Sequence, residues 1–136
     1  MSREIWARVA EARPLLHHLT NRVAAPLQAE VALALGACPV MTSWPPEAGS
    51  VARRSQGVLV NGGTPETEAL AWQDEALAAT EGTGIPRLLD LVGCGLSSPR
   101  TERLRALLDR HRFACVKGNG AEVAALAGHP ALPPST

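Results

Sequence analysis

The sequence predicts an α/β fold built on a mostly parallel sheet of about five strands. Short apolar runs of strand length alternate along the chain with segments whose apolar residues recur at helical spacing. Three of these runs, 58–60, 88–89 and 113–116, break off into a polar residue among glycines. Because ligands bind beyond the carboxyl ends of parallel strands, the three ends predict one side of a small-molecule site.

The strands are expected, in chain order, at 15–19, 38–41, 57–60, 87–89 and 113–116. The helices are expected at 2–12, up to residue 35, and at 45–55, 65–80, 99–111 and 121–127. Thr20 or Asn21 is a candidate N-cap for the second helix. Pro26, tolerated only in a first turn, predicts that its regular part begins nearby.

Length and composition indicate one folded domain over residues 1–128, followed by a proline-rich coil tail at 129–136. Hydrophobic residues make up 46% of the 136 residues and the formal net charge is zero. This balance argues against disorder and gives no electrostatic reason to expect nucleic acid or a membrane surface as a partner. No apolar stretch approaches the roughly 18 residues of a membrane span, and Glu4 interrupts any signal-peptide pattern. We therefore expect a cytoplasmic location.

The cysteines and a histidine pair are weak functional signals. Cys38, Cys94 and Cys115 are widely spaced, which favours reduced thiols over disulfides or a zinc site. Cys115 is expected in the core, while Cys94 between two glycines is either a turn residue or a nucleophile, the former being favoured. His17 and His18 are neighbours in a strand and point to opposite faces, so they cannot chelate one metal ion.

Polar residues at the strand ends are the stronger candidates. The run 61–64, Asn-Gly-Gly-Thr, either presents backbone N–H groups to a ligand or forms a tight loop capped by Thr64. Asp90 follows an apolar strand, where a carboxylate is costly unless it caps, pairs or binds a metal. Lys117 could neutralise a phosphate and Glu122 could hold Mg²⁺ directly or through water. Asn119 and Glu122 also match a helix-capping box, and both interpretations can hold together.

At these residues the sequence resembles the hydroxyethylthiazole kinase family. The stretch 16–41, reading Leu-His-His-Leu-Thr-Asn and ending Ala-Leu-Gly-Ala-Cys-Pro-Val-Met, is similar to the opening of that family. The runs 61–64, 84–95 and 117–122 follow in the family's order, and the resemblance covers about residues 13–128. It implies a ribokinase-like three-layer α/β/α fold and a trimer. It also implies Mg²⁺-dependent phosphoryl transfer from ATP to the thiazole alcohol used in thiamine biosynthesis and salvage.

The resemblance also implies roles for individual residues. Those expected at the substrate are Asn21, Val23 and Met41; those at ATP are Lys117 and Asn119; those at Mg²⁺ are Asp90 and Glu122. The sequence departs from the family at four positions, namely Pro26, Glu30, Leu91 and Lys117. Lysine in place of the usual arginine keeps the charge but loses the planar two-pronged contact with phosphate.

The resemblance corresponds to the N-terminal half of the family. The other half carries the catalytic cysteine, an anion hole at a helix N-terminus and most of the adenine site, so no residue here is assigned as catalytic. Cys94 belongs to a different loop. We expect kinase activity only with a complementary chain or a continuation of this one. The alternative is a non-catalytic kinase-like domain that binds a small ligand or only oligomerises.

Overall fold

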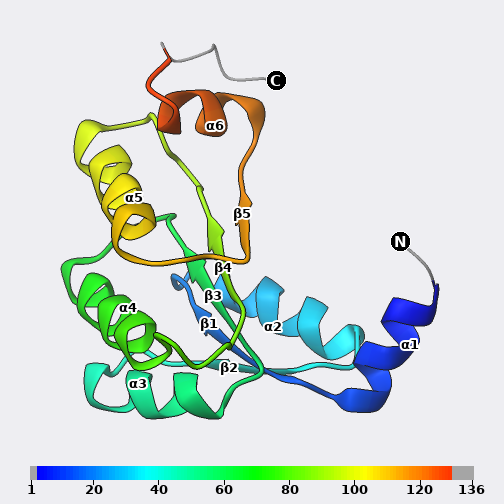
Figure 1. Cartoon of the computed structure of the whole chain (residues 1–136). Coiled ribbons are helices and arrows are strands. Elements are labelled where there is room, and N and C mark those ends of the chain that lie inside the picture. Colours follow the sequence, from blue (N-terminus) through cyan, green and yellow to red (C-terminus); the bar gives the residue numbers. More distant parts are fainter. Residues whose placement is uncertain (1–2, 130–136) are drawn as a thin grey trace.

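The structure is a computed structural model that describes residues 3–129 of the chain. It confirms the predicted α/β class: five strands form one parallel sheet with helices on both faces (Figure 1). The strands are β1 (Leu15–Leu19), β2 (Cys38–Met41), β3 (Gly57–Asn61), β4 (Arg87–Asp90) and β5 (Cys115–Lys117). The helices are α1 (Arg3–Ala12), α2 (Ala25–Ala34), α3 (Pro45–Arg54), α4 (Thr67–Ala79), α5 (Ser98–Arg110) and α6 (Gly120–Leu126).

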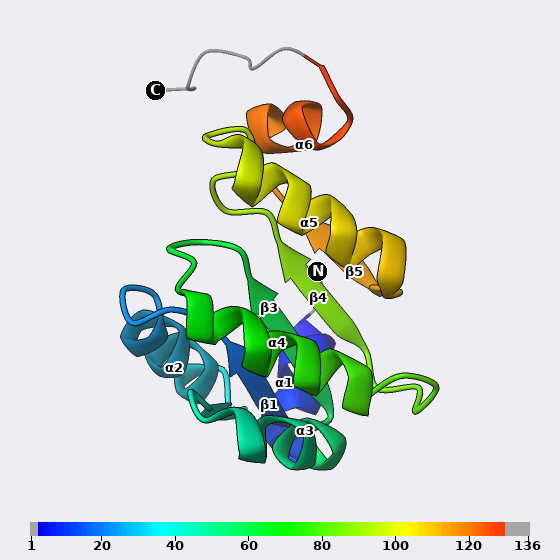
Figure 2. The same ribbon diagram turned by 90° about the vertical axis from the view of Figure 1, so that its left-hand side faces the viewer.

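The strand order is β2-β1-β3-β4-β5, so the chain changes direction across the sheet between β1 and β3. Helices α1 and α2 lie on one side of the sheet, and α3, α4 and α5 lie along the other (Figures 1 and 2). This is the three-layer arrangement expected from the sequence. None of the helices in residues 3–129 has the length and apolar character needed to cross a membrane.

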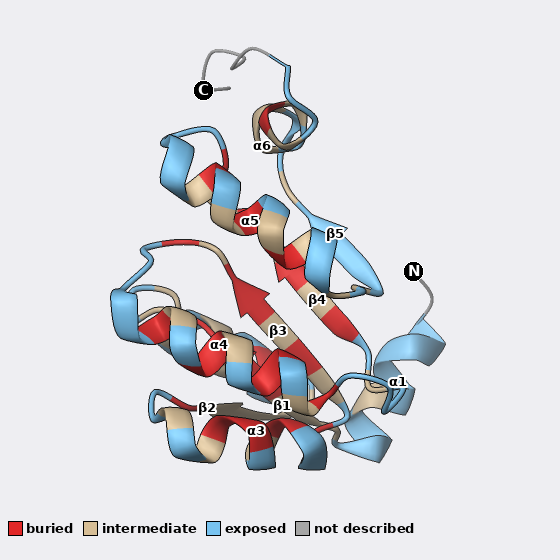
Figure 3. Cartoon of the chain, turned by 60° about the vertical axis from the view of Figure 1, so that its left-hand side comes forward, coloured by how far each residue is buried: buried red, intermediate tan, exposed pale blue. Residues whose placement is uncertain are grey.

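The core lies between the sheet and helices α3, α4 and α5 (Figure 3). Alternate strand residues enter it: Val60 pairs in register with Leu89, and both are fully buried. Leucines from the helices fill the space above, and Ala48, Ala52 and Ala76, all 0% exposed, allow α3 and α4 to pack closely. Small helix residues thus bring the layers close together in a core that contains few aromatic side chains.

The opposite face of the sheet is only partly covered. Leu16, Leu59, Leu88 and Cys115 line a groove of about 350 Å³ on this face, which we call the open face. A second apolar groove of about 540 Å³, beneath α1 and α2, shares Leu16 with the first. On the surface of α2, Leu27, Val31 and Leu33 are 66%, 49% and 60% exposed. A large part of the apolar surface of this chain is thus presented to solvent.

Two expectations about the fifth strand are wrong. It spans Cys115–Lys117 rather than 113–116, and all three of its residues are exposed, including Cys115, which was expected in the core. The reason is position: β5 is the edge strand, so an apolar run there gains no cover on its outer side. The core contact comes instead from Phe113, just before the strand.

Two helix starts also differ from expectation. Helix α2 begins at Ala25 with Pro26 in its first turn, as the proline predicted, but neither Thr20 nor Asn21 is its N-cap residue. Helix α4 begins at Thr67 with its N-cap at Glu66, so the alternative of a cap at Thr64 is wrong. Thr64 instead adopts a left-handed backbone (φ +44°) in the loop between β3 and α4.

The other helices agree with the predicted ranges to within two residues. At the C-terminus, His129 belongs to no helix or strand, and the rest of the predicted coil tail, 130–136, lies outside the described residues. Cys38, Cys94 and Cys115 are free thiols, as expected.

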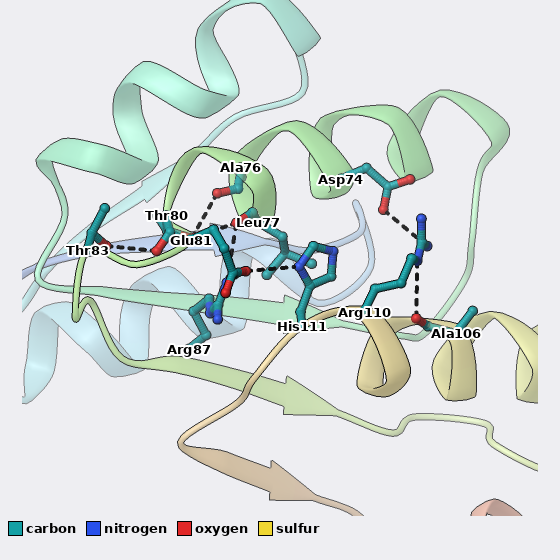
Figure 4. Close-up of polar contacts among 10 residues, drawn as sticks. All are labelled: Asp74, Ala76, Leu77, Thr80, Glu81, Thr83, Arg87, Ala106, Arg110 and His111. Atoms are coloured by element: carbon teal, nitrogen blue, oxygen red, sulfur yellow. Dashed lines mark hydrogen bonds and ion pairs between the residues drawn. The ribbon is translucent and has the colours of Figure 1, made fainter.

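A polar cluster lies at the amino end of β4, which is the end of the strand away from the predicted site (Figure 4). Arg87, 7% exposed, forms an ion pair of 2.9 Å with Glu81 and donates to the carbonyl of Leu77 at 3.3 Å. His111 contacts the same Glu81 carboxylate at 3.4 Å. The hydrogen bond from Arg87, and then that from His111, lowers the pKa of Glu81. The cluster satisfies a buried guanidinium and fixes where β4 begins, so we assign it a structural role.

Candidate functional site

The carboxyl ends of the strands form the rim predicted from the sequence. Asn61, Asp90 and Lys117 are register partners on adjacent strands, so they end β3, β4 and β5 side by side. One cleft of about 250 Å³ lies between this rim and the starts of α4 and α5. A second, of about 360 Å³, lies at the ends of β1 and β2. Both include Asn21, next to the β1–β3 position where such sheets bind ligands.

Asn21 has every hydrogen-bonding group of its side chain in use. Its Oδ1 accepts from the backbone N–H of Val23 (3.0 Å) and Ala24 (2.9 Å), which fixes the turn before α2. Its Nδ2 donates to Oδ1 of Asn61, the last residue of β3 (3.2 Å), and to the carbonyl of Gly63 in the loop that follows (3.0 Å). Asn21 therefore joins the ends of two strands and shapes the loop between them.

The other residues expected at the substrate lie around the same loop. Met41 ends β2 and lines the second cleft together with Asn21, so the structure brings these two together. Val23 is 79% exposed on the turn that Asn21 fixes. The cleft is thus lined by apolar side chains, among them Met41 and Trp72, and by polar ones, among them Asn21 and Glu66.

Asp90 and Lys117 form an ion pair across the ends of β4 and β5. Lys117 Nζ lies 3.1 Å from both carboxylate oxygens of Asp90. The Asp90 side chain is 14% exposed and that of Lys117 is 63% exposed. Pairing with Lys117 therefore stabilises this carboxylate, and the lysine reaches it with a side chain that is largely exposed to solvent.

Glu122 and Asn119 form the capping box that the sequence predicted. Asn119 Oδ1 accepts from the backbone N–H of Glu122 (2.9 Å), and Glu122 Oε2 accepts from that of Asn119 (2.8 Å). The other carboxylate oxygen, Oε1, accepts from the backbone N–H of Gly93 at 3.0 Å. Glu122 thereby ties the start of α6 to the loop after β4. Within residues 3–129 no three His, Cys, Asp or Glu side chains are grouped to hold a metal ion.

The glycine-rich loop after β4 is closely packed. Gly93 has a left-handed backbone (φ +76°), and a Cβ on it would collide with the guanidinium of Arg100. Arg100 lines the 250 Å³ cleft and was not identified from the sequence, where it is one of several arginines in a helix. Cys94 is 5% exposed and packs in the core, which agrees with a turn residue.

The two neighbouring histidines point to opposite faces, as expected. His17 Nε2 lies 2.7 Å from the hydroxyl of Thr42, and His18 Nδ1 lies 3.2 Å from Gln28 Oε1. Burial, and to a lesser extent the nearby His18, lowers the pKa of His17 to about 4. Burial also lowers the pKa of His18, opposed by its hydrogen bond to Gln28. Both rings are therefore neutral at neutral pH.

The fold and the rim together define a class: a doubly wound α/β protein whose polar strand ends surround clefts at the change of sheet direction. The model of the hydroxyethylthiazole kinase family matches residues 6–132, and the chain belongs to this family. It is 40% identical over 115 residues to a hydroxyethylthiazole kinase of Corynebacterium efficiens, covering 85% of this chain and 42% of the relative. It is 40% identical over 125 residues to one of Haemophilus influenzae, covering 90% and 46%.

Solved structures give the same result. The structure of a hydroxyethylthiazole kinase protein from Pyrococcus horikoshii matches with a TM-score of 0.87 and 36% identity, covering 92% of this chain and 49% of that one. A receiver domain of a sensor histidine kinase from Pseudomonas aeruginosa, 14% identical with a TM-score of 0.53, shares the fold alone. This chain therefore spans about half the length of the kinases it matches.

Proposed function

We propose that this chain forms the substrate-facing rim of a hydroxyethylthiazole kinase, which uses ATP and Mg²⁺ to phosphorylate the thiazole alcohol. The proposal rests on the hydrogen bonds from Asn21 to Asn61 and Gly63, which order the ends of β1 and β3 where the sheet changes direction. They occur in a chain of this family. The thiazole ring would lie in the cleft that Asn21 and Met41 line. Val23, which is exposed on the adjoining turn, would approach it from outside that lining. The apolar Met41 side chain suits a flat heterocycle.

The phosphates of ATP would lie at the neighbouring strand ends. Lys117 supplies a mobile positive charge there, beside Asn119. Mg²⁺ prefers oxygen ligands and usually keeps several of its waters. Asp90 and Glu122 fit such a role, because each carboxylate oxygen that accepts one hydrogen bond retains a second lone pair for a metal-bound water. When bound, the ion would neutralise phosphate charge.

The remaining machinery would come from residues equivalent to the part of the relatives that this chain does not match. That part would be supplied by a continuation of the polypeptide or by a complementary chain, within a homo-oligomer that we expect to be a trimer. The test is release of ADP by the purified chain with Mg²⁺ and ATP, with and without the thiazole alcohol. Thiazole-dependent release from the chain alone would show that this half suffices.

Replacing Asp90 by asparagine is expected to abolish Mg²⁺-dependent turnover in an active assembly while changing the fold little. The substitution keeps the shape but removes the charge that faces Lys117 at 3.1 Å. The measurement is ADP release over a range of Mg²⁺ concentrations, alongside the circular dichroism spectrum. Asp109→Asn, in α5, is the matched control. Full turnover in the Asp90 variant would remove this residue from the mechanism.

A second candidate is a binding module without turnover. It is favoured by the internal use of the charged groups: Lys117 pairs with Asp90, and both oxygens of Glu122 accept backbone N–H groups. Such a module would bind the thiazole alcohol, and its affinity would not depend on Mg²⁺ or ATP. An affinity that rises on addition of Mg²⁺ and a nucleotide would contradict it.

The open face gives a prediction about assembly. Exposed apolar grooves of this size are typical of interaction surfaces, so we expect the isolated chain to self-associate reversibly through Leu59 and its neighbours. Leu59→Lys should lower the apparent mass seen by sedimentation velocity at a fixed concentration. Leu96→Lys is the control, because Leu96 is already 80% exposed and lies away from the open face. Equal sedimentation of both variants and the parent chain would show that the open face does not mediate association.

A further inference from the structure

Asn61, at the end of β3, is used more fully than its place in a glycine-rich loop predicts. Asn61 is only 5% exposed, so its side chain is buried. Its Oδ1 accepts two hydrogen bonds, one from the backbone N–H of Gly63 at 2.8 Å and one from Asn21 Nδ2 at 3.2 Å. One oxygen atom thus holds both the loop after its own strand and the side chain of Asn21, two residues beyond β1.

The contact depends on a close approach of the loop. A Cβ on Gly63 would lie 2.9 Å from Asn61 Oδ1 and 3.0 Å from Val92 Cγ1, too close for an ordinary side chain. The adjoining residue, Gly62, donates its N–H to the carbonyl of Asp90 at 2.9 Å. The loop after β3 is therefore bonded to the segment after β1 on one side and to the end of β4 on the other.

The effect of Asn61 reaches the proposed substrate cleft through one residue. Asn21 Nδ2 is held by Asn61 and by the carbonyl of Gly63, and this fixes the plane of the Asn21 amide. With that plane fixed, Oδ1 faces the N–H groups of Val23 and Ala24. Rotation of the amide would break all four bonds, so a change at Asn61 should loosen the turn that carries Val23.

We propose that Asn61 is a positioning residue for the thiazole cleft, acting through Asn21 to hold the turn at residues 21–24. The inference rests on the proposed function in one respect, the identity of the ligand. Its structural part does not: the coupling of Asn61 to the turn can be measured without any ligand. Two substitutions separate the roles of the side chain, because Asn61→Ala removes the accepting oxygen whereas Asn61→Asp retains it.

The first measurement is amide hydrogen exchange at Val23 and Ala24 in the full chain. Asn61→Ala should speed their exchange by about tenfold, the effect of losing about one hydrogen bond, while core amides such as Leu89 change less. Asn61→Asp should keep the slow exchange. Asn119→Ala is the matched control, since it removes an asparagine that caps a different helix. Unchanged exchange in Asn61→Ala, or equal acceleration in Asn119→Ala, would overturn the proposal.

The second measurement is the affinity of each variant for the thiazole alcohol. Asn61→Ala should weaken binding by about tenfold and Asn61→Asp should restore most of it. If Asn61→Ala frees the turn but the parent chain binds no thiazole, the proposed function fails and the coupling stands. If the parent chain binds thiazole and Asn61→Ala binds equally well, the positioning role is refuted and the proposed function stands.

Discussion

Replacing Leu89 by alanine is expected to lower the free energy of unfolding by about 2–5 kcal/mol, the usual cost of a cavity in a tightly packed core. Leu89 is 0% exposed in the middle of β4, where it faces the helices on the covered side of the sheet. The measurement is urea-induced unfolding followed by circular dichroism. Because the chain is small, a loss of this size is a large part of its total stability.

Leu88→Ala is the matched control for this change. Leu88 is the adjacent residue of the same strand, but its side chain lines the open face and is only half-buried. Its truncation removes fewer contacts and leaves no closed cavity, so we expect a loss of less than about 1 kcal/mol. A loss as large as that of Leu89→Ala would show that the open face is covered in solution, and would contradict the one-sided core described here.

Acidification is expected to destabilise the chain through His17, whose pKa is lowered to about 4 by burial. The unfolded chain takes up a proton near the ordinary pKa of 6.5, whereas the folded chain does so only near 4. The contribution of His17 to the free energy of unfolding is therefore fully present above pH 6.5. It is lost as the pH falls from 6.5 toward 4. The loss from this residue should be about 2 kcal/mol at pH 5 and about 3 kcal/mol below pH 4.

The measurement is the free energy of unfolding at several pH values between 8 and 4, for the parent chain and for His17→Gln. The variant cannot titrate at this position, so its stability should fall less steeply over the same range. A residual slope is expected from His18, whose pKa is lowered in the same direction. Identical slopes in the parent and the variant would show that His17 does not set the acid sensitivity.

The sequence predicted most of the fold because its local signals agree with the final packing. Pro26 marks the start of α2, and the alternation of apolar runs gives all five strands. The errors arise where position in the sheet decides the outcome. Cys115 is in an apolar run like those of β3 and β4, but it is exposed because it lines the uncovered open face on the edge strand β5.

The sequence predicted which strand ends form the candidate site. It did not predict the hydrogen bonds that connect them. Sequence patterns predicted the capping box of Asn119 and Glu122, because its two members are three residues apart. They could not predict that Glu122 also binds the N–H of Gly93, or that Asn21 meets Asn61, forty residues away. Such contacts depend on strand order, and a parallel sheet brings distant residues together only after its topology is known.

The internal bonds also change how the family residues are understood. Asn21 and Glu122 were expected to contact ligands, yet both have their carbonyl or carboxylate oxygens bonded to backbone N–H groups. Each therefore orders a loop at the rim, whatever it does to a ligand. A polar residue at a binding site can therefore act by holding the surrounding loop in place.

The most direct test of the proposed rim is titration of the ¹⁵N-labelled chain with the thiazole alcohol, followed by NMR. Saturable shifts are expected in the amides of residues 21–24 and 41–43, which line the cleft of Asn21 and Met41 or lie next to residues that do. Smaller shifts are expected at Asn61 and Gly63, which are bonded to Asn21. No saturable shift, or shifts confined to the open face around Leu59 and Leu88, would contradict the assignment of this rim as the thiazole site.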